Sequence, residues 1–313
     1  MGSTWFKRKT LSGQDNLNRL RVAEVISALS QALDLGSGAT QWHSVRTCIL
    51  GMRLAAELRL PTSVQTDLFY ALLLKDAGCS SNASEIHHAL ASDDLAAKRD
   101  VKKTDWTRTS WETLQYALTH IAPGKPMRQR VQAILRVASQ QKQHTRQVTA
   151  IRCERGATLA RLMGLSEATA EGIGALDEHW NGHGNPEGLR RDQIPIASRI
   201  MLLAQTLDIF YTDAGSERAL ELVAQRSRTW FDPEIVLAAT ALDRQQQLWR
   251  GLDSEDPMSL ALDLEPGRLI MSEGNVSLDA ICRAFAQIVD AKSPFTYNHS
   301  NGVANAAVAI AGN

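Results

Sequence analysis

Apolar residues recur three and four positions apart along most of this chain, which places them on one face of a helix. In the first such run, Val22, Ile26 and Leu29 follow this spacing. Helices are predicted over residues 18–35, 43–60, 66–76, 111–120, 127–139, 152–163, 168–176, 194–211, 217–225, 234–248, 278–289 and 301–311. A single short extended segment is predicted at 268–271. The pattern therefore predicts an all-α fold.

Polar and glycine-rich stretches divide this helical pattern into parts. Residues 1–17 are polar, and we expect them to be disordered. Residues 18–250 form one predicted domain, and the stretch 251–275, rich in Asp, Glu, Ser and Gly, is expected to be a linker. Helical spacing resumes at 276–313, which is too short to bury a core of its own.

Composition excludes several classes of partner. The 313 residues include 34 basic and 34 acidic side chains, so net charge predicts neither a nucleic acid polymer nor a membrane as partner. No apolar run reaches the ~18 residues of a membrane span. The four cysteines form no CxxC pair, which is typical of a reduced, cytoplasmic protein. The basic stretch 98–155 is interpreted as a solvated face, with an anion-facing surface as the alternative.

The two ends of the chain share a short sequence pattern. Residues 34–44 align without a gap on residues 290–300. The identical pairs are Asp34/Asp290, Ser37/Ser293, Thr40/Thr296, His43/His299 and Ser44/Ser300. A coincidence of helix-capping chemistry is the alternative explanation. We interpret 276–313 as the first two helices of a second copy, which either belong to a truncated domain or pack on the first.

The stretch 176–189 is a shaped loop between two apolar helical runs. Three glycines and a proline fall between Gly182 and Gly188. Glycine reaches backbone angles that other residues avoid, and proline fixes one torsion. A rigid loop that also carries His179 and His183 is a common place for binding or catalysis.

Several motifs in this order resemble the HD-GYP family, a branch of the HD superfamily of metal-dependent phosphohydrolases. Lys75-Asp76 stands where the family has its His-Asp pair, and 178–186 resembles its HHExxDGxGYP motif. Residues 195–200 and 231–233 resemble the elements that follow, and 290–300 resembles the family's opening. The resemblance implies an HD-type helical bundle, two or three iron or manganese ions, and hydrolysis of cyclic dinucleotides, chiefly cyclic di-GMP.

The resemblance gives the first copy an incomplete set of metal ligands. His43 stands at the opening His and Asp76 at the bridging Asp, while His299 is the opening His of the second copy. The positions that depart from the family's ligands are Lys75, Arg152, Leu176, Asp177 and Gln205, and those that depart from its loop motif are Asn181 and Asn185. We expect the first domain to be catalytically degenerate and to bind no metal. Its buried Asp76 should instead form an ion pair with Lys75 or Arg152.

The loop still offers groups that could contact a ligand phosphate. The predicted ligand-binding residues are Glu178, His179, Gly182, His183, Gly184, Pro186 and, outside the loop, Arg152. Two other interpretations stay open: the loop histidines are simply exposed, and His43 is a core or capping histidine.

Three hypotheses about function follow. The first is an HD-GYP-type signalling protein whose degenerate first domain is regulatory. The second is a non-catalytic module that binds a nucleotide or protein, or dimerises, through the loop 176–189 and the basic face 98–155. The third is a single-metal hydrolase that uses His43 and Asp76. The expected partners are a cyclic dinucleotide, and a second copy of the chain or other signalling proteins.

Overall fold

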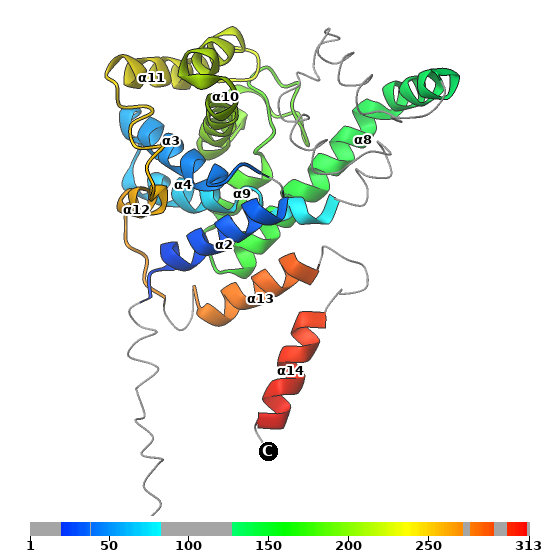
Figure 1. The fold of residues 1–313 in the computed structure, drawn as a ribbon, viewed down its shortest axis with the longest axis vertical. Helices are drawn as coiled ribbons and strands as arrows, with labels where there is room; N and C mark the ends of the chain where they lie inside the picture. The colour runs from blue at the N-terminus through cyan, green and yellow to red at the C-terminus, as the bar shows by residue number, and fades with distance from the viewer. Residues whose placement is uncertain (1–19, 38, 83–126, 272–275, 291–298, 312–313) are drawn as a thin grey trace, which may run out of the picture.

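The computed structural model describes residues 20–37, 39–82, 127–271, 276–290 and 299–311 (Figure 1). Throughout these residues the regular structure is helical, and strand pairing is limited to isolated bridges. The predicted all-α fold is therefore confirmed. The predicted disordered N-terminus and the helix predicted at 111–120 lie outside the described residues.

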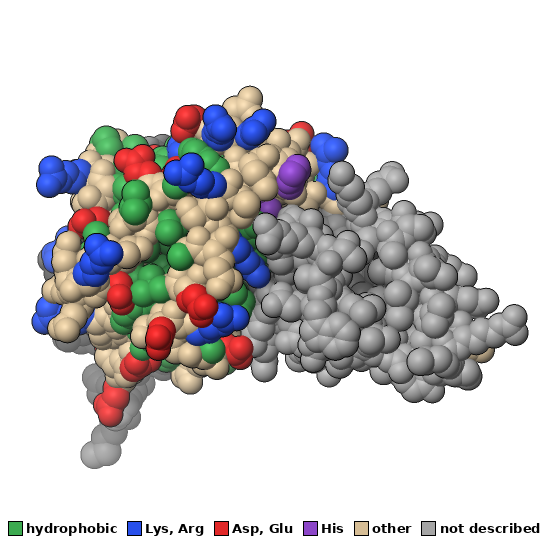
Figure 2. All heavy atoms as spheres, turned by 90° about the horizontal axis from the view of Figure 1, so that it is seen from above, with side chains coloured by type: hydrophobic (Ala, Val, Ile, Leu, Met, Phe, Trp, Pro, Cys, Tyr) green, Lys and Arg blue, Asp and Glu red, His purple; other side chains and the backbone are tan. Residues whose placement is uncertain are grey.

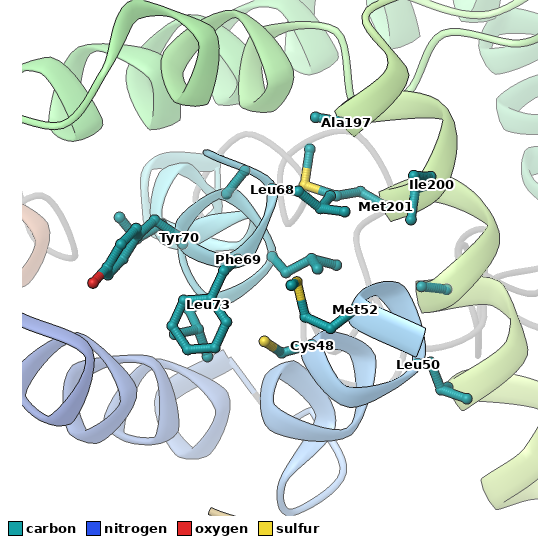
Figure 3. Close-up of a cluster of buried hydrophobic side chains, with 14 of the residues drawn as sticks. Cys48, Leu50, Met52, Leu68, Phe69, Tyr70, Leu73, Ala197, Ile200 and Met201 are labelled. Carbon is teal, nitrogen blue, oxygen red and sulfur yellow. The ribbon is translucent and has the colours of Figure 1, made fainter. Parts of the chain in front are cut away.

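Three helices form the centre of the core: α3 (His43–Glu57), α4 (Thr62–Leu74) and α10 (Ile196–Gln225). Figure 3 shows Cys48 and Met52 of α3 beside Phe69 of α4, with the α10 side chains next to them. Gly51 permits the close approach of α3 and α4, because a Cβ atom there would lie 2.6 Å from Leu72 Cδ1. Burial of these apolar side chains is the main stabilising term.

Four further helices surround this centre, and their bounds differ in part from the prediction. They are α2 (Val22–Ser37), α8 (Met127–Leu162), α9 (Glu167–Gly174) and α11 (Pro233–Arg244). The helices predicted at 127–139 and 152–163 are one continuous α8, because the residues between them include no glycine or proline that would break it. Within α10, Gly215 has φ 86° and interrupts the helix between the two predicted segments.

The stretch expected to be a linker is instead packed on the domain. It contains α12 (Pro257–Asp263), which contacts α3 and α2. Glu265 is buried and accepts hydrogen bonds from Tyr70 Oη at 2.6 Å and Arg21 Nη2 at 2.6 Å. The predicted extended segment is present, since Ile270 forms an antiparallel bridge with Arg21. The polar residues that suggested a linker thus serve as helix caps and buried hydrogen-bond partners.

The last two helices lie at one end of the molecule (Figure 1). Helix α13 (Leu278–Asp290) packs against α8 and the short 3-10 helix η1 (Ala77–Asn82). Arg155 of α8 also donates a 2.8 Å hydrogen bond to the carbonyl oxygen of Gln287. Helix α14 (His299–Ala311) projects away from the bundle, and its side chains are largely exposed.

On the face in Figure 2, basic and acidic side chains are interspersed over the described part of the chain. Among the described helices, none is both long enough and apolar enough to cross a bilayer.

Candidate functional site

His43, at the start of α3, contacts two charged side chains, Asp208 and Lys75. His43 is the first residue of α3 and is buried. Its Nδ1 lies 2.6 Å from Asp208 Oδ2 of α10, and its Nε2 lies 3.0 Å from Lys75 Nζ. Since the ammonium can only donate, Nε2 is the acceptor and Nδ1 carries the proton that Asp208 accepts. Both ring nitrogens of His43 are therefore used within the protein.

Lys75 and Asp76 follow directly after α4 and form a buried ion pair. The pairing expected for Asp76 is thus made by Lys75, at the place where the resemblance sets a metal-binding pair. Asp76 Oδ1 also accepts a weak hydrogen bond from Cys79 Sγ at 3.5 Å, and Asp76 Oδ2 lies 3.8 Å from His43 Nε2. The structure therefore brings His43, Lys75 and Asp76 together.

A fourth member of this cluster, Asp208, was not identified from the sequence. It is fully buried, and Arg46 Nε donates to its Oδ1 at 2.5 Å while Arg46 Nη2 reaches Oδ2 at 3.2 Å. Burial opposes ionisation of Asp208, but hydrogen bonds from His43 and Arg46 outweigh it and hold the pKa of this carboxyl below its ordinary value. Gln205 precedes Asp208 by one helical turn, and this i,i+3 spacing is the signal that could have drawn attention to Asp208.

Arg152 also departs from the residue type that the resemblance implies, and its partner is Asp177 of the loop. Arg152 of α8 forms an ion pair with Asp177, and both side chains are partly exposed. Cys153 Sγ donates a weak hydrogen bond to the same carboxylate at 3.7 Å. The two positions that depart from the family's histidines thus compensate each other.

These residues do not fit a divalent metal ion. A metal would need Nε2 of His43, but the Lys75 ammonium lies 3.0 Å from this nitrogen. The carboxylates of Asp76 and Asp208 are already paired with Lys75 and Arg46. Among the described residues, no group of three or more His, Cys, Asp or Glu side chains is arranged to hold a metal. The third hypothesis, a single-metal hydrolase, has no support in this geometry.

Hydrogen bonds to a buried carboxylate fix the shape of the loop 176–189. Glu178 is buried, and its Oε1 accepts hydrogen bonds from the backbone amides of Glu187 at 2.7 Å and Gly188 at 3.0 Å. Burial raises the pKa of the Glu178 carboxyl, although these amides act in the opposite direction. At Gly184, a Cβ atom would lie 2.2 Å from the backbone nitrogen of His179, so only glycine fits there. Glu178 and Gly184 therefore shape the loop rather than face outward.

The loop histidines differ in their surroundings. His179 is buried and stacks on Trp230, with ring centroids 4.2 Å apart, and Arg226 lies 4.3 Å from the same indole. The His183 side chain is exposed, while its backbone amide donates to Asn181 Oδ1 at 3.0 Å. His183 is thus the loop histidine that a ligand can reach.

The other residues predicted to bind a ligand or a metal are Pro186, Gly182 and His299. Pro186 follows a cis peptide bond, and its carbonyl oxygen accepts a 2.6 Å hydrogen bond from Arg146 of α8. Gly182 has φ 82°, a left-handed angle that favours glycine. His299 is exposed at the start of α14, a helix that projects away from the bundle (Figure 1).

The two repeated segments make the same contact. In the first, Ser44 donates to Asp34 from its backbone nitrogen at 2.8 Å and from its hydroxyl at 2.7 Å. In the second, Ser300 donates to Asp290 from its backbone nitrogen at 3.0 Å and from its hydroxyl at 2.5 Å. The sequence identity at these positions thus corresponds to one shared connection between consecutive helices.

Part of the chain matches a known domain family, and most of it is similar to known phosphodiesterases. Residues 130–235 match the HD domain family. The chain is 37% identical over 287 residues to the "3'3'-cGAMP-specific phosphodiesterase 3" of Vibrio cholerae, covering 92% of this chain and 62% of that protein. A crystal structure of a cyclic GMP-AMP-specific phosphodiesterase from V. cholerae superposes with a TM-score of 0.68 at 33% identity, over 90% of this chain and 63% of that one. The chain thus spans less than two thirds of the length of the relatives it matches.

Proposed function

We propose that this chain is a member of the HD superfamily and a signalling protein of the HD-GYP type, whose first domain, residues 18–250, is a non-catalytic regulatory unit; the match of residues 130–235 to the HD domain supports this. The substrate class of the system is a cyclic dinucleotide, since the V. cholerae relative is described as specific for 3'3'-cGAMP. Metal-dependent hydrolysis is assigned to a second HD-type unit, in which His299 stands at the position of His43.

The observation that carries this proposal is the position of the Lys75 ammonium. It lies 3.0 Å from the acceptor nitrogen of His43 and pairs with Asp76. A fixed positive charge at that place opposes a divalent cation and supplies the charge that the buried carboxylate needs.

Elemental analysis of the purified chain tests the proposal. We expect far less than one equivalent of iron or manganese per chain, because Nε2 of His43 already contacts Lys75. Samples prepared with each metal in excess and then desalted should give the same result.

The matched variants are Lys75→His and Lys75→Met. The imidazole of the first adds a ligand beside His43 and Asp76, so bound metal should rise, whereas the uncharged side chain of the second adds none. Two stoichiometric metal ions in the unmodified chain would contradict the proposal.

A second candidate function is a module that binds a cyclic dinucleotide or protein without cleaving it. The observation that favours it is the loop 176–189, whose shape is fixed by the buried Glu178 although the described residues around it offer no group of metal ligands. Exposed His183 and the partly exposed Arg152 are the groups that could meet a phosphate.

Calorimetric titration of the chain with 3'3'-cGAMP and with cyclic di-GMP tests this second function. If the loop binds a phosphate through His183, then His183→Ala should weaken binding by about tenfold, or about 1.4 kcal/mol. The control is His299→Ala, another exposed histidine, which should leave the affinity unchanged. Absence of heat at high micromolar concentration of both nucleotides would rule this function out.

A further inference from the structure

A shallow, open pocket of about 310 Å³ lies at the surface directly after the loop 176–189. It is lined by Arg190, Arg191 and Gln193, and the last two belong to the short 3-10 helix η2 (Arg191–Gln193). All three residues are exposed. The pocket includes no member of the buried His43 cluster, so it is a separate feature of the surface.

Contacts with the loop and within η2 hold these residues in place. The backbone amide of Arg191 donates to the carbonyl oxygen of Trp180 at 3.1 Å, and that of Arg190 donates to Gln193 Oε1 at 3.0 Å. The stem of the Arg190 side chain lies over Gly182, where an added Cβ atom would be 3.4 Å from Arg190 Cβ. The pocket is therefore formed before a ligand binds, which lowers the entropic cost of binding.

The two arginines of the pocket keep their charges available. Among the described residues, neither guanidinium forms an ion pair or a hydrogen bond. Asp192 lies between Arg191 and Gln193 in the sequence, but its carboxylate is 3.2 Å from Arg199 Nη1. Two positive side chains thus line one pocket without a negative partner.

We propose that this pocket binds the terminal phosphate of a small phosphate monoester. A guanidinium is a planar fork that donates to two phosphate oxygens at once, so Arg190 and Arg191 suit such a group. The Oε1 atom of Gln193 already accepts from the Arg190 amide, which leaves the side-chain nitrogen of Gln193 as a further donor.

Charge favours a monoester over a diester. A phosphate monoester carries about −1.5 to −2 at pH 7, whereas a phosphodiester carries about −1. Two arginine side chains therefore match the monoester better. The volume indicates a small ligand, because about 310 Å³ is near the lower end of the range of small-molecule sites, ~300–1,000 Å³.

This preference has a consequence if the chain acts with a cyclic dinucleotide phosphodiesterase, a consequence that rests on the proposed function. Hydrolysis adds the oxygen of water to phosphorus and breaks one P–O bond of the diester, and the released ribose oxygen takes a proton. The product is a linear dinucleotide that ends in a phosphate monoester. The pocket would then distinguish the product of such an enzyme from its cyclic substrate. Binding of a monoester by itself does not depend on the proposed function.

Calorimetric titration of the full chain with inorganic phosphate, 5'-GMP and the methyl ester of 5'-GMP tests the proposal. The last two differ only in that the ester is a diester. We expect 5'-GMP to bind at least as tightly as inorganic phosphate, and the methyl ester to bind about tenfold more weakly than 5'-GMP, or about 1.4 kcal/mol.

Two double variants locate the site. Arg190→Gln/Arg191→Gln should weaken binding of 5'-GMP by about tenfold or more. Arg190→Lys/Arg191→Lys keeps the charge but removes the planar forks, so its loss should be smaller but measurable. The matched control is Arg59→Gln/Arg244→Gln, which removes two exposed arginines outside the pocket and should leave the affinity unchanged. Circular dichroism checks that each variant remains folded.

Absence of 5'-GMP binding at millimolar concentration would overturn the proposal, and so would equal binding of 5'-GMP and its methyl ester. Wild-type affinity in the glutamine variant would place the ligand elsewhere. An equal loss in the control variant would show attraction by net charge alone. Metal content and the effect of His183→Ala on cyclic dinucleotide binding do not involve Arg190 or Arg191, so they report on the proposed function separately.

Discussion

Replacing Asp208 with asparagine should lower the free energy of unfolding by about 3–5 kcal/mol. Asp208 is fully buried and receives hydrogen bonds from both His43 and Arg46. The amide keeps the shape of the carboxyl group but removes its charge, which leaves the Arg46 guanidinium uncompensated. Chemical denaturation followed by circular dichroism gives the measurement, and the exposed Asp263→Asn on α12 is the control that should change stability little.

The effect of this substitution should also depend on pH. The pKa of Asp208 is lower in the folded state than in the unfolded state. Its contribution to the free energy of unfolding is therefore complete above the unfolded pKa, about 3.9. It is lost as pH falls through the still lower folded pKa. The difference between wild type and Asp208→Asn should therefore be constant near neutrality and shrink in strong acid. A small difference in stability at neutral pH would show that Arg46 and His43 find other partners.

Replacing Gly78 with alanine should have the second largest effect on stability. We expect it to lower the free energy of unfolding by about 3 kcal/mol or more. A Cβ atom at Gly78 would lie 2.0 Å from the carbonyl oxygen of Arg152 and 2.9 Å from the backbone nitrogen of Gly156. Both are backbone atoms of α8, so the clash is relieved only by moving η1 away from that helix. Thermal and urea unfolding measure the loss.

Gly174→Ala is the matched control for this substitution. The added Cβ atom would meet Ala157 Cβ at 3.9 Å, an ordinary contact, so stability should be nearly unchanged. The movement of η1 in Gly78→Ala should also disturb Asp76, which immediately precedes it, and α13, which packs on it. An unchanged unfolding midpoint would show that η1 is not held against α8 in solution.

Ion pairs and hydrogen bonds between its own side chains hold the cluster around His43 together inside the fold. These side chains form one continuous series of hydrogen bonds. Asp208 accepts from Arg46 and from His43, and Lys75 donates to both His43 and Asp76. Two carboxylates are matched by two basic side chains, and the two ring nitrogens of His43 join these pairs. Removal of any member leaves a buried group unpaired, which costs more than the pair contributes.

Several features could be predicted because they depend on local pattern. Helical spacing predicted α3, α4, α9 and α11 to within a few residues, since burial of one helix face imposes that spacing. The linker expected at 251–275 was the main error in the helical plan, since polar composition does not distinguish solvated residues from buried ones such as Glu265.

The candidate site was predictable only in part. The proximity of His43, Lys75 and Asp76 followed from the resemblance, whereas Asp208 and Arg46 escaped notice because no sequence spacing links α3 to α10. For the loop, the sequence indicated a fixed shape but not that Glu178 turns inward to the backbone amides.

By itself, the sequence determined the all-α class and the identical residues shared by 34–44 and 290–300, because these depend on residue types and short spacings. Tertiary structure alone decided which charges pair, since a buried carboxylate takes the cation that packing brings within reach: Lys75 for Asp76, and Arg152 for Asp177. It also decided which face of α13 is buried. Amphipathic spacing shows that a helix has an apolar face, but only packing shows which of two such faces is already covered.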